Sequence, residues 1–305
     1  MFKKIMFATT ASSNCDDAAK VAFDLADKYN SELTVFHAYG VPDRTTFGPL
    51  MKDPKTGEVK EFDRNYETWA EEEIRSIYKE EISKAKNCRI EIAGGFPHTE
   101  ILRAARKNNA DLIVMGAHSR KEELGATRFR SVVGTTMQKV AQKSRAPILI
   151  VSRPCTTCFW YFNNIMCGVD FSKGSFSAFK FAYKTAKEIG CRLYLFHCVD
   201  ISTLQAGKAK AQSEIEDKII LAKEKIKTHY LSEMDDYDNY EVTIWEGVPY
   251  VELLKFSREK SIDLIVMAHD TKDTEEDETI LGSTVEQVVL RASCPVASVN
   301  RPNKI

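Results

Sequence analysis

Two short segments, one around Gly116 and one beginning at Gly134, form the pattern in this sequence best suited to bind a phosphate. The apolar run at residues 112–115 predicts a buried strand, and Gly116 follows it directly. Gly134, Thr135 and Thr136 stand at the expected start of an amphipathic helix. Glycine permits close approach to the backbone, and the amides at a helix start attract anions. The segment therefore predicts a phosphate cradle made from the end of a strand and the start of a helix.

The same order of features returns in the second half of the chain. Asp111-Leu-Ile-Val-Met matches Asp263-Leu-Ile-Val-Met, and Gly134-Thr-Thr matches Gly282-Ser-Thr. Further matches occur in the same order in both halves: Ile5-Met6 with Ile165-Met166, Leu33-x-x-Phe-His with Leu193-x-x-Phe-His, Gly95-x-Pro with Gly247-x-Pro, and Ala146-Pro with Cys294-Pro. We therefore expect two duplicated domains, at residues 1–153 and 164–305, with a linker at 154–163.

Alternating strands and helices predict an α/β fold in each half, with parallel strands and helices on both faces of the sheet. In the first half, strands are expected at residues 5–8, 33–39, 89–93, 112–115 and 148–151, and helices at 14–29, 62–86 and 97–107. Asn14 is the expected cap of the first helix. Residues 41–60 contain three prolines and two glycines and predict a long loop. The helix at 62–86 is expected to present one apolar stripe to the core: Trp69, Ile74, Ile77, Tyr78 and Ile82.

Composition narrows the class of protein. The chain has 305 residues, 43% of them hydrophobic and 29% charged, which is typical of a globular protein with about two domains. The formal net charge of −1 argues against a chain-wide electrostatic attraction to nucleic acid or to membranes. Apolar runs are too short for a signal peptide or a membrane span. The eight cysteines do not have the density of a small secreted scaffold, so we expect reduced thiols in a cytoplasmic protein.

On these residues the chain resembles a tandem member of the universal stress protein family. The resemblance rests on the Asp-Leu-Ile-Val-Met strands, the Gly-Thr or Gly-Ser start of the last helix, and the final Ala-Pro or Cys-Pro strand. It implies an adenine-nucleotide-hydrolase-like fold with two tandem doubly wound domains, each with a five-stranded parallel sheet in the order 3-2-1-4-5. It also implies pairing of the last strands, here residues 147–151 with 295–299 within one chain, and it leaves a homodimer open.

The resemblance further implies positions for an adenine nucleotide. Nucleotide-binding members carry Gly-x-x-Gly, nine residues and Gly-Ser/Thr, together with an aspartate after the first strand. The corresponding positions here are Thr9, Thr10, Met115, Gly116, Ser119, Gly134, Thr135 and Thr136 in the first half, and Val169, Asp170, Met267, Ala268, Gly282, Ser283 and Thr284 in the second.

Neither copy of the motif is intact. In the first half, Thr10 replaces the aspartate and Ser119 the second glycine. In the second half, Ala268 and Thr271 replace both leading glycines, although Asp170 is retained. Asp170 has two interpretations, as a ligand for ribose or metal and as a cap of the following turn, and the second is slightly favoured.

Charge distinguishes the halves. The segment between Gly116 and Gly134 is basic on balance, whereas residues 270–278 hold six acidic side chains against one lysine. A triphosphate near the acidic segment would be repelled unless a divalent cation intervened. We therefore expect any ATP or other adenine nucleotide, with Mg²⁺, to bind the first half.

The expected function is regulatory, in the stress response, exerted through protein partners, with neither nucleic acid nor membrane among them. Catalytic signatures of adenylyl transferases and ATP pyrophosphatases do not occur, nor does the phosphate loop of NTPases, so an enzyme is not expected. Two alternatives stay open, a scaffold that binds no nucleotide and a weak ATPase.

The histidines and the Cys-x-x-Cys pair are further candidates for a site. His37 and His197 are interpreted as packed, hydrogen-bonded side chains rather than ligands, while His118 and His269 could lie near a ligand or on an exposed loop. Cys155 and Cys158 form a lone Cys-x-x-Cys without a second ligand pair, so no metal site is expected.

Overall fold

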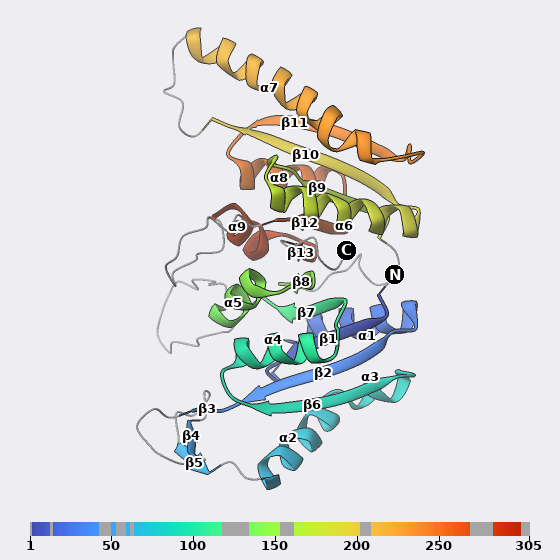
Figure 1. Cartoon of the computed structure of the whole chain (residues 1–305), viewed down its shortest axis with the longest axis vertical. Helices are drawn as coiled ribbons and strands as arrows, with labels where there is room; N and C mark the ends of the chain where they lie inside the picture. Colours follow the sequence, from blue (N-terminus) through green and yellow to red (C-terminus); the bar gives the residue numbers. More distant parts are fainter. Residues whose placement is uncertain are drawn as a thin grey trace. The chain divides into compact units, whose positions relative to one another are not determined.

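The computed structural model describes residues 2–12, 15–42, 50–52, 59–61, 64–117, 134–152, 162–201, 209–268 and 283–299. The chain divides into two compact units, residues 1–151 and 152–305 (Figure 1). Each unit is an α/β domain around five parallel strands, which confirms the predicted fold class.

In unit 1 the strands lie in the order β6-β2-β1-β7-β8, which is 3-2-1-4-5 in chain order. Their bounds are β1 Lys4–Thr9, β2 Glu32–Tyr39, β6 Cys88–Gly94, β7 Leu112–Gly116 and β8 Ile148–Val151. Unit 2 repeats this order as β11-β10-β9-β12-β13. Its strands are β9 Asn164–Gly168, β10 Arg192–Asp200, β11 Tyr240–Gly247, β12 Leu264–Met267 and β13 Val296–Ser298.

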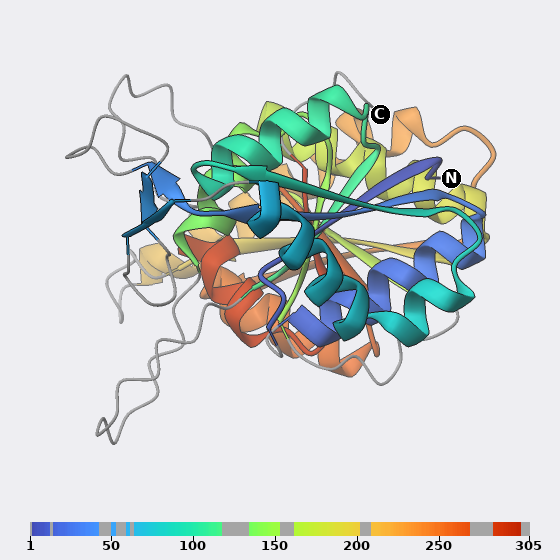
Figure 2. The ribbon, with the colours of Figure 1, turned by 90° about the horizontal axis from the view of Figure 1, so that it is seen from below.

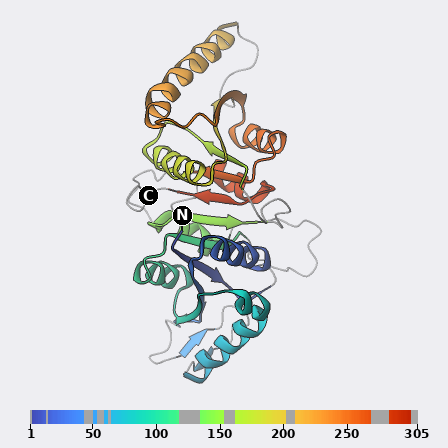
Figure 3. The same ribbon diagram turned by 90° about the vertical axis from the view of Figure 1, so that its right-hand side faces the viewer.

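Helices cover both faces of each sheet. Those of unit 1 are α1 Asp16–Tyr29, α2 Arg64–Ile77, α3 Lys79–Lys84, α4 Pro97–Lys107 and α5 Thr135–Lys143. Those of unit 2 are α6 Lys173–Ile189, α7 Ala209–His229, the short 3₁₀ helix η2 Leu231–Glu233, α8 Pro249–Glu259 and α9 Ser283–Arg291. In unit 1, α4 and α1 lie on opposite sides of the strands (Figure 2), and in unit 2, α6 and α7 lie opposite α8 (Figure 3).

The interiors of the central strands are apolar, as expected where helices cover both faces of a sheet. Met6 and Phe7 in β1 and Ile113 and Val114 in β7 are fully buried. In unit 2, Ile165 takes the place of Ile5 at the start of the central strand and is equally buried. Uninterrupted apolar runs could therefore be recognised as strands.

The predicted loop at residues 41–60 is wrong in part. Short strands β3 Val41–Pro42, β4 Leu50–Lys52 and β5 Val59–Glu61 form a separate antiparallel sheet in the order β3-β4-β5. Proline lacks an amide donor and suits the end of a strand, so Pro42 is compatible with this small sheet.

The predicted continuous helix at 62–86 is also wrong, because it breaks at Tyr78 into α2 and α3. Ile74 and Tyr78 are buried as expected, but Trp69 is 53% exposed and Ile77 is 42% exposed. Ile74 and Tyr78 therefore pack into the core, Ile82 is half-buried, and Trp69 and Ile77 are exposed. The first helix begins at Asp16 after Cys15, and the expected cap Asn14 lies outside the described residues.

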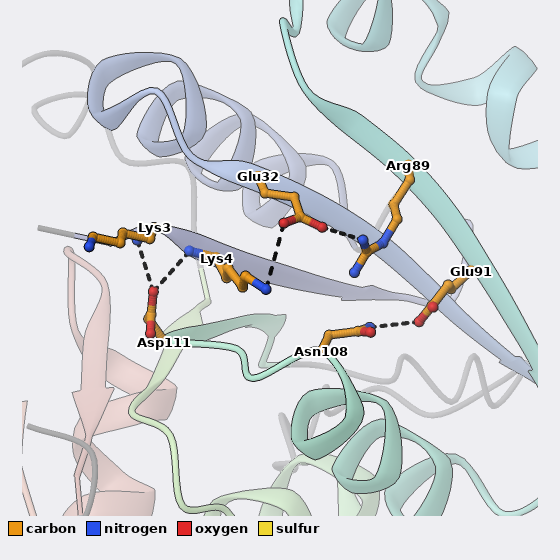
Figure 4. A network of polar contacts seen from close by, with 7 residues as sticks. All are labelled: Lys3, Lys4, Glu32, Arg89, Glu91, Asn108 and Asp111. Carbon is orange, nitrogen blue, oxygen red and sulfur yellow. Dashed lines mark hydrogen bonds and ion pairs between the residues drawn. The ribbon is translucent and has the colours of Figure 1, made fainter.

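The repeated Asp-Leu-Ile-Val-Met motif has a structural cause. Asp111 Oδ2 accepts hydrogen bonds from the amides of Lys3 and Lys4, both at 2.9 Å (Figure 4). Asp263 Oδ2 accepts the same bonds from Asn163 and Asn164, at 2.9 and 3.0 Å. Each aspartate thus joins the start of the fourth strand to the start of the first.

A second repeated feature has reversed its charges. In unit 1, Glu32 at the start of β2 forms an ion pair with Arg89 on β6 (Figure 4). In unit 2, Arg192 at the start of β10 forms an ion pair with Glu241 on β11, at 2.9 Å. Because both pairs join the second strand to the third, the contact persists while the two charges have changed places.

Candidate functional site

The structure brings the two halves of the predicted phosphate cradle together at the carboxyl edge of the unit 1 sheet. Ala8 lies opposite Met115 in the register of β1 and β7, so Thr9 and Thr10 follow beside Gly116. The Ala117 amide donates to the Val151 carbonyl at 2.9 Å. The Gly134 amide in turn donates to the Ala117 carbonyl at 3.3 Å, which places the start of α5 beside the end of β7. Ligands of open α/β sheets bind at this edge.

The start of α5 has the donors that an anion needs. Gly134 is the N-cap, and the first intrahelical bond runs from the Gln138 amide to the Gly134 carbonyl. The amides of Thr135, Thr136 and Met137 are therefore the ones for which the helix supplies no acceptor. Thr135 is exposed and Thr136 is half-buried, while the Met137 side chain is buried. The amides and hydroxyls of both threonines can face a ligand.

The electrostatics of α5 favour an anion. Its first turn contains no acidic side chain, and Lys139 and Lys143 carry its only charges. His98 on α4 lies close enough to both lysines to respond to them, because burial first and then these two charges lower its pKa. The helix dipole places a partial positive charge at the start of α5, whereas Lys143 lies in its last turn.

Thr9 and Thr10 differ in what they can offer a ligand. Thr9 is 6% exposed, and its Oγ1 is hydrogen-bonded to the Tyr78 hydroxyl at 2.7 Å and to the Ala11 amide at 2.9 Å. Thr10 is exposed, and its Oγ1 lies 2.8 Å from Ser12 Oγ and 3.4 Å from Cys15 Sγ. The Thr9 hydroxyl is therefore used in bonds within the protein, whereas Thr10 is exposed at the carboxyl edge of the sheet.

The two equivalent histidines are packed and hydrogen-bonded, as their pattern predicts. Nδ1 of His37 lies 2.9 Å from the Thr9 carbonyl, and Nδ1 of His197 lies 2.7 Å from the Val169 carbonyl. Burial lowers the pKa of His197, against the opposing effect of its bond to Val169. Each histidine ties the end of the second strand to the end of the first. His118 and His269 lie outside the described residues.

In unit 2, Asp170 caps the turn that follows β9. Its Oδ1 accepts a hydrogen bond from the Ser172 amide at 2.9 Å, and Ser172 Oγ accepts one from the Ser175 amide at 3.0 Å. This agrees with the interpretation of Asp170 as a capping residue. Val169 beside it is buried.

The other half of the unit 2 site is described in part. Met267 lies opposite Ser298 in the register of β12 and β13, and Ala268 follows it. Ser283 and Thr284 begin α9, whose first turn contains Glu286. An acidic side chain in this turn disfavours an anion, so the described residues of unit 2 form a poorer cradle than those of unit 1. Gly282, like Ser119 of unit 1, lies outside the described residues.

The sequence did not reveal a role for Tyr78 and Tyr230, one buried tyrosine beneath the carboxyl edge of each sheet. Tyr78 and Tyr230 are 2% and 1% exposed, and their hydroxyls lie 2.7 Å from Thr9 Oγ1 and 3.2 Å from Ser175 Oγ. Tyr78 was assigned only to an apolar stripe. A signal was available, because the two tyrosines stand at equal distances before Gly95 and Gly247.

Other classes of site have less support within the described ranges. There, no group of three or more His, Cys, Asp and Glu side chains is arranged to hold a metal ion. The described helices include none that is both long and apolar enough to cross a membrane. A small hollow near Ala26, Asn30 and Asn87 lies at the amino edge of the unit 1 sheet, away from the cradle. Cys155 and Cys158 lie outside the described residues.

Comparison with known proteins supplies the family context. The profile of the universal stress protein family matches residues 1–152 and again residues 162–300. Universal stress protein MJ0531 of Methanocaldococcus jannaschii is 30% identical over 145 residues, covering 47% of this chain and 85% of the relative. Universal stress protein MJ0577 of the same organism is 26% identical over 162 residues, covering 50% of this chain and 96% of the relative.

Solved structures agree on the fold over the full length. A universal stress protein from Archaeoglobus fulgidus superposes with a TM-score of 0.65 at 21% identity, covering 98% of both chains. A protein of Pseudomonas aeruginosa, PA1789, whose description calls it functionally unknown, gives a TM-score of 0.63 at 14% identity, covering 99% of this chain and 94% of that one.

Proposed function

The chain belongs to the universal stress protein family in both of its halves, and from this premise we propose that it is a regulatory protein of the stress response that binds ATP or another adenine nucleotide in unit 1. The observation that carries the proposal is the bond between the Gly134 amide and the Ala117 carbonyl. It sets the start of α5 beside the ends of β1 and β7, so that strand-end residues and helix amides converge at one edge.

The phosphates would lie on the amides and hydroxyls of Thr135 and Thr136. Backbone amides at a helix start bind phosphate through hydrogen bonds and the helix dipole together. Met115, Gly116 and Thr10 would border the rest of the nucleotide, and Ser119 is the remaining predicted contact. Mg²⁺ would accompany the phosphates, because a hydrated divalent cation offsets their charge.

Unit 1 is favoured over unit 2 by charge. Lys139 and Lys143 are the only charged side chains of α5, whereas α9 has Glu286 in its first turn. Glu286 would lie close to a phosphate bound at Ser283 and Thr284 and would repel it. Unit 2 then contributes to domain pairing within the chain, to a homodimer or to contact with regulatory protein partners in the cytoplasm.

The proposed role is binding rather than catalysis. A positioned phosphate can meet water without a dedicated base, so slow hydrolysis of ATP is compatible with this role, whereas multiple turnover at an enzymatic rate is not. A turnover assay at high protein concentration separates the two.

One observation favours a second candidate function, a scaffold that binds no nucleotide. Thr10 stands where nucleotide-binding relatives carry an aspartate, and its hydroxyl is already bonded to Ser12. A nucleotide would have to compete with this bond or bind without Thr10. The scaffold would act through its protein partners alone.

Nucleotide occupancy distinguishes these functions. We expect adenine nucleotide in the material released from the purified protein by denaturation, and a rise in melting temperature of the stripped protein when ATP and Mg²⁺ are added. Thr136→Ala should reduce the affinity, and the matched Thr284→Ala in unit 2 should leave it unchanged. An empty protein with no thermal shift would favour the scaffold.

A further inference from the structure

In both units the helix that precedes the third strand of the sheet, α2 in unit 1 and α7 in unit 2, ends at a buried tyrosine. The hydroxyl of this tyrosine reaches the carboxyl edge of the sheet. Tyr78 separates α2 from α3, and Tyr230 separates α7 from η2. Burial raises the pKa of both phenols, that of Tyr230 to about 12. Both side chains therefore remain neutral hydroxyls in the physiological range and can donate a hydrogen bond.

Each tyrosine connects to the backbone of the turn after the first strand through one intermediate hydroxyl. In unit 1, Thr9 Oγ1 bonds to Tyr78 at 2.7 Å and accepts from the Ala11 amide at 2.9 Å. In unit 2, Ser175 Oγ bonds to Tyr230 at 3.2 Å and accepts from the Asp170 amide at 3.1 Å. The tyrosine, hydroxyl and turn amide form a relay in each unit.

The intermediate hydroxyl comes from different positions in the two units. Thr9 of unit 1 corresponds to Val169, and Ser175 of unit 2 corresponds to Cys15. Cys15 is buried and near enough to Tyr78 to contribute to the raised pKa of this phenol, and it is the sequence equivalent of Ser175. Each unit thus keeps one hydroxyl opposite its tyrosine although the position that supplies it has changed.

The turn held by the relay is strained. Ala11 and Phe171 occupy the same place in the two turns, with φ of +54° and +68°. Side chains other than glycine rarely adopt positive φ, and such a conformation persists where its surroundings hold it. The relay supplies one of these restraints, because the Ala11 amide is one of its members.

We propose that Tyr78 is a positioning residue that acts through Thr9 to hold the turn carrying Thr10 at the carboxyl edge of the unit 1 sheet. Through the same bonds, nucleotide binding at this edge is linked to the break between α2 and α3. The link to occupancy rests on the function proposed above. The positioning of the turn does not, because it concerns hydrogen bonds within the protein.

Tyr78→Phe in the full-length protein is the central test, since it removes one hydroxyl and keeps the ring. Without nucleotide, we expect the amides of the 9–12 turn to exchange with solvent about threefold to tenfold faster, the range for loss of one hydrogen bond. With nucleotide, we expect the Kd for ATP to rise by a similar factor. In the wild type, ATP should slow amide exchange around residues 74–82, and the variant should lose this response.

A compensating variant separates positioning from general damage. Thr9→Val should reproduce the effects of Tyr78→Phe. The double variant Thr9→Val, Cys15→Ser installs the arrangement of unit 2 and should restore exchange and Kd to within about twofold of wild type, since one hydroxyl again faces the tyrosine. Tyr230→Phe is the matched control and should alter the 169–172 turn while leaving the Kd unchanged.

The outcomes are distinguishable. A wild type that binds ATP, with Tyr78→Phe unchanged in Kd and in exchange of the 9–12 turn, would overturn this inference and leave the proposed function intact. A wild type that binds no nucleotide would overturn the proposed function and with it the link to occupancy. The exchange measurement then still decides the positioning role. Faster exchange of the 9–12 turn in Thr9→Val that the added Cys15→Ser restores supports the role, and unchanged exchange refutes it.

Discussion

Truncation of Asp263 should be among the costliest single changes of a charged side chain in unit 2, because this carboxylate is buried. Its Oδ2 accepts hydrogen bonds from the amides of Asn163 and Asn164, at 2.9 and 3.0 Å, and the residue is 4% exposed. A hydrogen bond to a charged group contributes about 1.5–3 kcal/mol, and water can replace part of it after truncation. We therefore expect Asp263→Ala to lower the free energy of unfolding of unit 2 by about 2–4 kcal/mol.

Asp111 provides the matched comparison. It makes the same two bonds, to Lys3 and Lys4, but its contacts lie at an exposed position. Water can reach the released amides there, so Asp111→Ala should cost unit 1 about 1–2 kcal/mol. Asparagine at either position keeps one neutral acceptor and should cost about half as much as alanine.

The measurement must separate the two units, because a chain with two domains need not unfold in one step. Hydrogen exchange followed by mass spectrometry does so, with peptides that cover β1 and β9 reporting on unit 1 and unit 2. The larger effect should appear in β9 for Asp263→Ala. Losses below about 0.5 kcal/mol in both variants would refute the reasoning, because surface substitutions without special contacts have effects of that size. A larger loss for Asp111→Ala than for Asp263→Ala would refute it as well.

Three further outcomes follow from contacts outside the nucleotide edge. Arg89→Glu should destabilise unit 1 in urea by about 1 kcal/mol, because it places like charges at the Glu32 contact, and Glu32→Arg in the same chain should recover part of the loss. Gly247→Ala should cost unit 2 several kcal/mol by thermal unfolding, since φ is +148° and the new Cβ would lie 2.6 Å from Glu252 Cγ; a loss within 0.5 kcal/mol would contradict this. His197 has a folded pKa below its ordinary 6.5, so the unfolded state binds more protons, and unit 2 should lose stability as pH falls below about 6.5. His197→Gln should remove that slope, and an unchanged slope would assign it to other groups.

The centre of each sheet could be predicted from the sequence because its strands contain continuous apolar runs. Residues 112–115 lie at the centre of unit 1 and are covered on both faces, so local composition and burial agree. The resemblance to a known family then supplied the strand order, which composition alone does not determine. The helix at Pro97–Lys107 was equally clear, because Pro97 marks its first turn.

The remaining features depend on tertiary contacts that local patterns do not encode. The apolar stripe from Trp69 to Ile82 continues through Tyr78, yet the helix breaks there, at the residue whose hydroxyl meets Thr9. The small antiparallel sheet at residues 41–61 was not predicted because the three prolines and two glycines of that segment indicate a loop. At the candidate site, sequence spacing identified Gly116 and Gly134 but could not show that Thr9 is buried and bonded behind the edge.

We propose that unit 1 binds an adenine nucleotide at the start of α5. Calorimetric titration of the stripped full-length protein with ATP and Mg²⁺ tests it most directly, with Thr136→Ala and Thr284→Ala as a matched pair. We expect one site per chain, weakened by Thr136→Ala and unaffected by Thr284→Ala. Absence of binding to the wild type, or weakening by Thr284→Ala alone, would contradict it.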